Sequence, residues 1–168
     1  MSFATRHFSS GELGNAPPEF ESNSYAVAQQ LERARSILGD NPIRVTSGYR
    51  SAEDNARVGG TSNSAHLTAQ AVDFTVATLT ASEVVRRLQA ARADGRFSYG
   101  ELIYDARNEH IHMTLPGIGG DGETLVELPG GKFEQFAAWL TRNQGPTLAV
   151  LLLALLLLLM VHHAVKSA

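Results

Sequence analysis

Three histidines and one aspartate have types and spacing that suit a metal site. The stretch "SAHLTAQAVDF" holds His66 and Asp73, and the segment "EHIHM" holds His110 and His112. In an extended strand, residues two apart point to the same side, so both strand histidines can address one point. The chain has no cysteine, and imidazole and carboxylate are natural zinc ligands where thiolates are absent. Catalytic zinc usually has three protein ligands and one open position, which His66, Asp73 and one strand histidine would supply.

Each of these residues also has an ordinary explanation when it is taken alone. A single loop histidine such as His66 is more often hydrogen-bonded or at the surface than bound to a metal. Asp73 could cap a turn or face solvent on an edge strand, and the two strand histidines could form a surface pair. Their combination in one chain is what favours a metal site.

Hydrophobic periodicity and helix caps predict the elements that must position these residues. The segment 71–76 alternates so that Asp73 lies opposite Val72 and Phe74, facing away from the core. The order of elements indicates an α+β domain with a small antiparallel sheet and helices packed around it. The expected elements are helices within 22–42, 51–60, 81–95 and 132–143, strands at 43–50, 71–76, 100–105 and 109–115, and a glycine-rich loop at 116–123.

Three segments resemble the motifs of one protein family. The stretch "SAHLTAQAVD" resembles the S-x-H-x-x-G-x-A-x-D motif of the zinc D-Ala-D-Ala carboxypeptidases and dipeptidases, a family that also includes phage L-alanyl-D-glutamate endolysins. "EHIH" resembles its E-x-x-H motif, and "TSGYRS" its S-G-[YF]-R segment. The matches occur in the family's order within residues 43–115. One departure is Ala69, which stands where the family has glycine and replaces no ligand.

The resemblance implies a hedgehog and D-Ala-D-Ala peptidase type of fold with zinc bound by His66, Asp73 and His112. It implies Glu109 as general base and acid, which takes a proton from water and returns it to the leaving amine. Strict alternation places Glu109 opposite His112, so it can act only from an irregular start of the strand.

The remaining site residues follow from the same resemblance. Arg50 is expected to bind the oxyanion of the reaction or a substrate carboxylate, where its planar fork can bind two oxygens. Ser64 is expected to support the site or contact substrate, with an ordinary turn serine as the alternative. His110 is expected as a transition-state donor or, as an alternative, a fourth ligand, which would close the site. Asp105 and Glu101 are the next candidates for the base.

The C-terminal segment differs from the rest of the chain in composition. Uninterrupted apolar residues run from Leu148 to Val161, and fourteen residues make a helix of roughly 21 Å. That is shorter than a bilayer core of about 30 Å, and extension through Val165 brings it to the usual range. We therefore expect a peptidase domain in 1–144 and a hydrophobic transmembrane helix in 145–168. A helix buried in a larger assembly, such as a virion, is the alternative.

Composition and the resemblance together frame the function. A net charge of −3 and a pI near 6 argue against a nucleic-acid partner. The resemblance implies a zinc peptidase that cuts a peptide of bacterial peptidoglycan. The apolar C-terminal segment adds the expectation that it is membrane-anchored at the cell envelope or, as an alternative, carried in a phage particle. The N-terminus does not have the pattern of a simple export signal. The alternatives are a non-catalytic zinc-stabilised binding module and a tail-anchored membrane adaptor without zinc.

Overall fold

The computed structural model describes residues 2–120, 122–128, 132–136 and 138–139. The chain divides into two compact units, Met1–Phe133 and Glu134–Ala168, and the architecture below is that of the first. The expected C-terminal helix at 145–168 and the expected boundary at 144 lie outside the described residues. Within the described part, no helix has the length and apolar character needed to cross a membrane.

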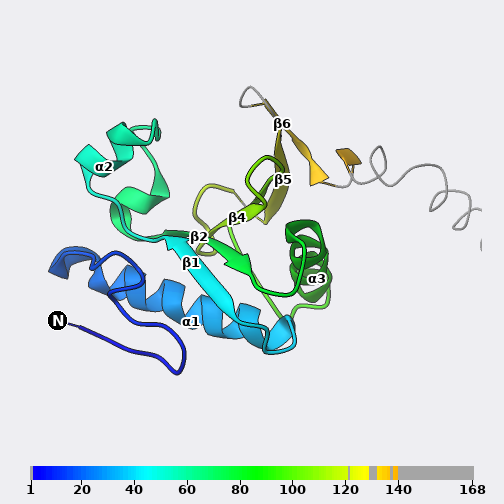
Figure 1. Ribbon diagram of the computed structural model, residues 1–168, viewed down its shortest axis with the longest axis horizontal. Helices are drawn as coiled ribbons and strands as arrows, with labels where there is room; N and C mark the ends of the chain where they lie inside the picture. Colours follow the sequence, from blue (N-terminus) through cyan, green and yellow to red (C-terminus); the bar gives the residue numbers. More distant parts are fainter. Residues whose placement is uncertain (1, 121, 129–131, 137, 140–168) are drawn as a thin grey trace, which may run out of the picture. The chain divides into compact units, whose positions relative to one another are not determined.

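The first unit is an α+β fold, as the sequence predicts (Figure 1). Its helices are α1 (Glu21–Ile37), α2 (Ala52–Arg57) and α3 (Ala81–Ala93), with short 3-10 helices η1 (Pro18–Phe20) and η2 (Ala65–Thr68). The strands are β1 (Ile43–Ser47), β2 (Ala71–Val76), β3 (Glu101–Asp105), β4 (His110–Thr114), β5 (Glu123–Leu128) and β6 (Lys132–Gln135), which crosses into the second unit.

Side-chain caps begin two of the predicted helices. The Ser51 hydroxyl accepts a hydrogen bond from the backbone N–H of Asp54 at 3.1 Å, at the start of α2. The Thr80 hydroxyl accepts one from the N–H of Glu83 at 3.3 Å, at the start of α3. Each bond satisfies one of the N–H groups that a helix leaves without a partner in its first turn.

The sheet is mixed, which corrects the expectation of a purely antiparallel sheet. Its strand order is β1-β2-β4-β3-β5-β6. The first four strands in this order pair antiparallel, whereas β5 runs parallel to β3. The chain must therefore pass β3 after leaving β4, and Gly117, Gly119 and Gly122 adopt positive φ in that connection. Pairing between β3 and β5 joins segments that are not adjacent along the chain and produces no periodicity within either of them. The sequence therefore did not predict β5.

The expected helix at 132–143 is wrong at its beginning. Residues Lys132–Gln135 form β6, and helical backbone appears only at the described residues 136, 138 and 139. The helical spacing of apolar residues there is a local signal, and sheet pairing overrides such signals when a neighbouring strand is available.

The two faces of the sheet have different roles. The first face packs against helices, and α3 contacts α1, β2, β3 and β4. The second face, which carries Asp73, is covered by the segment between α2 and β2, so Asp73 is only 7% exposed. The buried apolar residues on the helix side are Val27, Leu31, Ala34 and Leu38 of α1, Val84, Val85, Leu88 and Ala91 of α3, and Val72, Phe74, Leu102, Tyr104, Ile111 and Met113 of the strands.

Candidate metal centre

A cleft of about 880 Å³ opens on the second face of the sheet. One wall is the segment from Val58 to Gln70, and the floor is formed by cleft-facing residues of β2, β3 and β4. Six of the seven predicted site residues line it, namely Arg50, Ser64, His66, Asp73, His110 and His112. Glu109 is not among the described residues that line the cleft.

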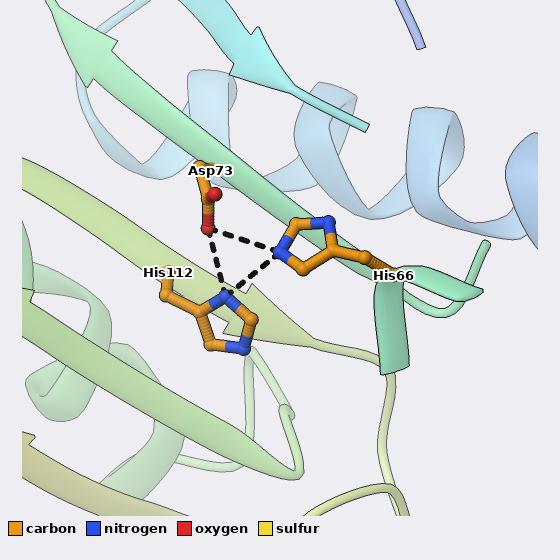
Figure 2. A group of neighbouring side chains, drawn as sticks. All are labelled: His66, Asp73 and His112. Carbon is orange, nitrogen blue, oxygen red and sulfur yellow. Dashed lines mark hydrogen bonds and ion pairs between the residues drawn. The ribbon is translucent and has the colours of Figure 1, made fainter. Parts of the chain in front are cut away.

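The three predicted ligands come together in this cleft (Figure 2). Asp73 Oδ1 lies 3.2 Å from His66 Nε2 and 2.8 Å from His112 Nδ1, and the two nitrogens are 3.2 Å apart. We call these residues the ligand triad. Two come from β2 and β4, where Asp73 and His112 are directly paired across the ladder, and the third comes from η2.

The triad has the shape and chemistry of a zinc site. Zinc–nitrogen and zinc–oxygen bonds of about 2.0–2.1 Å in a tetrahedron give ligand–ligand distances of about 3.3 Å. The triangle of 2.8 to 3.2 Å is therefore close to one face of such a tetrahedron. Two imidazole nitrogens and a carboxylate oxygen are ligand atoms that zinc would accept at this separation, and all three residues line the cleft.

His66 is fixed by its backbone and by its second ring nitrogen. Ser64 caps η2, accepting a hydrogen bond from the N–H of His66 at 3.4 Å. Nδ1 of His66 donates to the carbonyl of Gly48 at 2.6 Å, which selects the tautomer with a bare Nε2. A Cβ on Gly48 would lie 2.3 Å from the carbonyl oxygen of Leu13, so only glycine allows this approach.

Ala69 makes the turn that joins η2 to β2. Its φ of 55° and ψ of 30° are left-handed, a conformation that glycine adopts without penalty and alanine does not. The residue is 2% exposed. The substitution of the family's glycine therefore keeps the turn and stores backbone strain next to the triad.

Arg50 contacts Asp73 from the other side. Its guanidinium forms an ion pair with Asp73 Oδ2, and its Nε donates to the Ser47 hydroxyl at 2.8 Å. Oδ1 of Asp73 is left facing the two histidines. Burial raises the pKa of Asp73, but the neighbouring His112 and His66 side chains outweigh it and hold that pKa far below its usual range. Asp73 is thus a carboxylate, as a metal ligand must be.

His110 lies in the cleft but outside the triad. Strand alternation puts it on the same face as His112, as predicted, and its Nδ1 is 3.8 Å from Asp105 Oδ2. The group that can hold a metal contains His66, Asp73 and His112 without it. His110 therefore lies beside the triad in the cleft, and its role as a transition-state donor or a fourth ligand stays a prediction.

Glu109 does occupy an irregular position before β4, with a φ of 54°. Its carboxylate accepts a hydrogen bond from the Tyr104 hydroxyl at 2.5 Å, on the helix side of β3. Burial, together with the Glu109 carboxylate, raises the pKa of Tyr104. The catalytic role of Glu109 stays a prediction, since using it requires the side chain to leave Tyr104.

The alternative acids differ in their surroundings. Asp105 is buried and accepts hydrogen bonds from the N–H of Arg107 at 2.8 Å and the side chain of Asn108 at 2.7 Å, so it holds the β3–β4 turn. Glu101 lies in the cleft, with Oε2 at 3.9 Å from Nε2 of His112. Alternation along β3 could have found Glu101, whereas no sequence signal marks the carbonyl of Gly48 as a partner of His66.

Comparison with known proteins agrees with this geometry. The family model of peptidase M15 matches residues 3–114, which include the whole triad, so the chain belongs to the peptidase M15 family. A curated relative is the zinc D-Ala-D-Ala carboxypeptidase of Streptomyces albus G, 34% identical over 103 residues. The aligned region is 60% of this chain and only 36% of that relative. The predicted resemblance is confirmed at the level of the family.

Proposed function

We propose that the protein is a zinc-dependent peptidase that hydrolyses a peptide bond of bacterial peptidoglycan. The observation that carries the proposal is the ligand triad, three zinc-type ligand atoms within 3.2 Å of one another in an open cleft. When bound, zinc would polarise a peptide carbonyl and make water a nucleophile near neutral pH. The substrate class is supported by the similarity to the zinc D-Ala-D-Ala carboxypeptidase of Streptomyces albus G.

The residues around the triad supply binding and charge. Arg50 has five N–H donors, of which its recorded bonds to Ser47 and Asp73 use two, so the rest of its fork can bind a substrate carboxylate or oxyanion. His110, on the same face as His112, can donate a proton to developing negative charge. Ser64 lines the wall that an extended peptide would follow.

Glu109 is the proposed general base because it occupies the E-x-x-H position. Proton transfer from water to this carboxylate is proposed to accompany a change in the Tyr104 hydrogen bond when substrate binds. Replacement Glu109→Gln is expected to lower kcat by about 100-fold or more while zinc binding is kept, since general acid–base catalysis contributes about that much. Full activity in this variant would show that another group takes the proton.

The decisive experiment is digestion of purified peptidoglycan by the full chain, with mass analysis of the released fragments. Fragments are expected with zinc, and none are expected after chelation or in the Asp73→Asn variant. The fragment masses also name the bond, whether D-Ala-D-Ala, L-Ala-D-Glu or a crossbridge. Zinc binding without any fragment would contradict the proposal.

That outcome would favour the second candidate, a zinc-stabilised binding module. The position of Glu109 against Tyr104 supports this candidate, because a module that only binds needs the triad and no base. Retention of the chain on peptidoglycan with no change in fragment masses would identify it.

The place of action is also a proposal. The apolar run Leu148–Val161 supports attachment to a membrane at the envelope or burial in a phage particle. Both would bring the cleft close to the wall. Fractionation of cells that express the full chain, followed by alkaline washing of the membranes, separates an inserted segment from a peripheral one.

A further inference from the structure

Two members of the ligand triad have a clear partner for the atom that faces away from the metal position. The far nitrogen of His66 donates to the Gly48 carbonyl, and the far oxygen of Asp73 pairs with Arg50. Such outer partners orient metal ligands and tune their basicity. The far atom of the third ligand is Nε2 of His112, and the acid that faces it is Glu101.

The position of Glu101 is set by the sheet. Ile103 is the direct partner of His112 across the β3–β4 ladder, so Glu101 is its diagonal neighbour on the same cleft-facing side. The backbone N–H of Glu101 donates to the Thr114 hydroxyl at 2.8 Å, which anchors the start of β3. Its side chain is 22% exposed, so the carboxylate is partly shielded from water.

The turn after β4 closes on the same side chain. A Cβ on Gly119 would lie 3.2 Å from Oε2 of Glu101, and Gly119 has a φ of +78°. The Thr114 hydroxyl donates to the carbonyl of Ile118 at 2.6 Å, which ties this turn to β4. The glycine therefore leaves room for the Glu101 carboxylate beside His112.

We propose that Glu101 is a positioning residue that accepts a hydrogen bond from the Nε2–H of His112. This bond holds the proton on Nε2, so that Nδ1 of His112 is bare and faces the metal position. Oε2 of Glu101 and Nε2 of His112 are 3.9 Å apart, longer than a hydrogen bond, so the proposed bond requires the Glu101 side chain to move toward His112. The carboxylate fixes the Nδ1-binding tautomer and makes the imidazole a stronger donor. This inference rests on the zinc site of the proposed function and assigns a role to a residue outside the family's motifs.

The test measures zinc affinity by competition with a chromophoric chelator, using the full chain and three variants. Glu101→Gln keeps an oxygen acceptor but loses the charge, and Glu101→Leu loses both. Glu127→Gln is the matched control, because Glu127 lines the same cleft and pairs with Arg107 at 2.7 Å instead. We expect zinc dissociation constants about 10-fold higher for Glu101→Gln and up to about 100-fold higher for Glu101→Leu, with the control unchanged.

Unfolding of the metal-free proteins in urea separates positioning from simple destabilisation. Metal-free Glu101→Gln is expected to unfold as the parent chain does, so the affinity change arises at the metal. Equal zinc affinity in all variants would overturn the inference, as would loss of turnover at unchanged affinity, which would make Glu101 a base. A parent chain that binds no zinc would instead overturn the proposed function itself.

Discussion

At the residue scale, the backbone conformation of Ala69 explains why the family's motif has glycine at this position. The sequence raised the question whether alanine can make a turn that the related motif makes with glycine. The structure answers it, because Ala69 adopts the left-handed conformation and ends η2 within three residues of His66. The motif's glycine is thus explained by backbone geometry, and this chain tolerates the strain of an L-residue at that position.

Replacement Ala69→Gly is expected to stabilise the protein. Relief of the left-handed strain, about 1–2 kcal/mol, is opposed by the entropy that glycine adds to the unfolded chain, about 0.4–1 kcal/mol, so the net gain lies between about 0 and 1.6 kcal/mol. Urea unfolding with chelator present measures the change without a contribution from metal. Ala65→Gly, in η2 itself, is the control and should destabilise the chain. An equal loss of unfolding free energy in Ala69→Gly and Ala65→Gly would show that Ala69 is not under backbone strain.

At the scale of elements, strand pairing assembles the site. Asp73 of β2 and His112 of β4 are far apart in sequence and directly opposite in the ladder, so the register alone brings two ligands together. A shift of one residue would turn one of them to the helix side. On the other face α3 packs against β2, β3 and β4, and the Thr80 cap defines where that helix begins.

The first turn of α3 is expected to lose stability in acid. Hydrogen bonds from Arg86 and then Arg87 lower the pKa of Glu83 from 4.5 to about 2. Because the folded-state pKa is the lower one, this stabilisation is complete above pH 4.5 and is lost as pH falls toward 2. Glu83→Gln should therefore reduce the free energy of unfolding by about 0.5–1 kcal/mol at pH 7, a value typical of exposed pairs.

Urea unfolding of both proteins between pH 2 and pH 7 gives that difference directly. It should shrink toward zero near pH 2. When Arg86→Gln and Arg87→Gln are also present, most of the difference in unfolding free energy caused by Glu83→Gln should vanish at every pH. A difference that stays constant across this range would show that Glu83 acts without its charge.

At the scale of the whole molecule, the triad joins segments that are far apart along the chain. Zinc would link the loop wall, β2 and β4, so its binding should be coupled to folding of the first unit. The family match covers residues 3–114, and the β5 strand lies beyond it. The metal-binding part of the fold is therefore the part that this chain shares with the family.

Removal of metal is expected to lower the stability of the whole first unit. Free zinc at 100 times its dissociation constant adds about 2.7 kcal/mol to the free energy of unfolding. Thermal unfolding of the full chain with zinc and with chelator measures this shift. The Asp73→Asn variant is the control and should show none, since it lacks one ligand. A zinc-dependent shift that persists in this variant would place the metal elsewhere.

The sequence by itself determined the ligands and the elements that carry them. Periodicity and caps marked α1, α2, α3 and the first four strands, because these signals lie within a few residues of one another. Residue types and spacing predicted His66, Asp73 and one strand histidine as ligands, and the resemblance to the family's motifs selected His112. Ala69 could be identified as a departure from the motif's glycine, because it lies within the same short motif as His66 and Asp73.

Only the tertiary structure decided what depends on distant segments. It paired β5 parallel to β3, replaced the start of a predicted helix by β6, and put Glu101 rather than Glu109 beside the triad in the cleft. Strand neighbours and side-chain partners across a sheet are set by which surfaces bury one another. A pattern read along one segment does not contain that information, and so the approach of Glu101 to Nε2 of His112 became visible only in the folded chain.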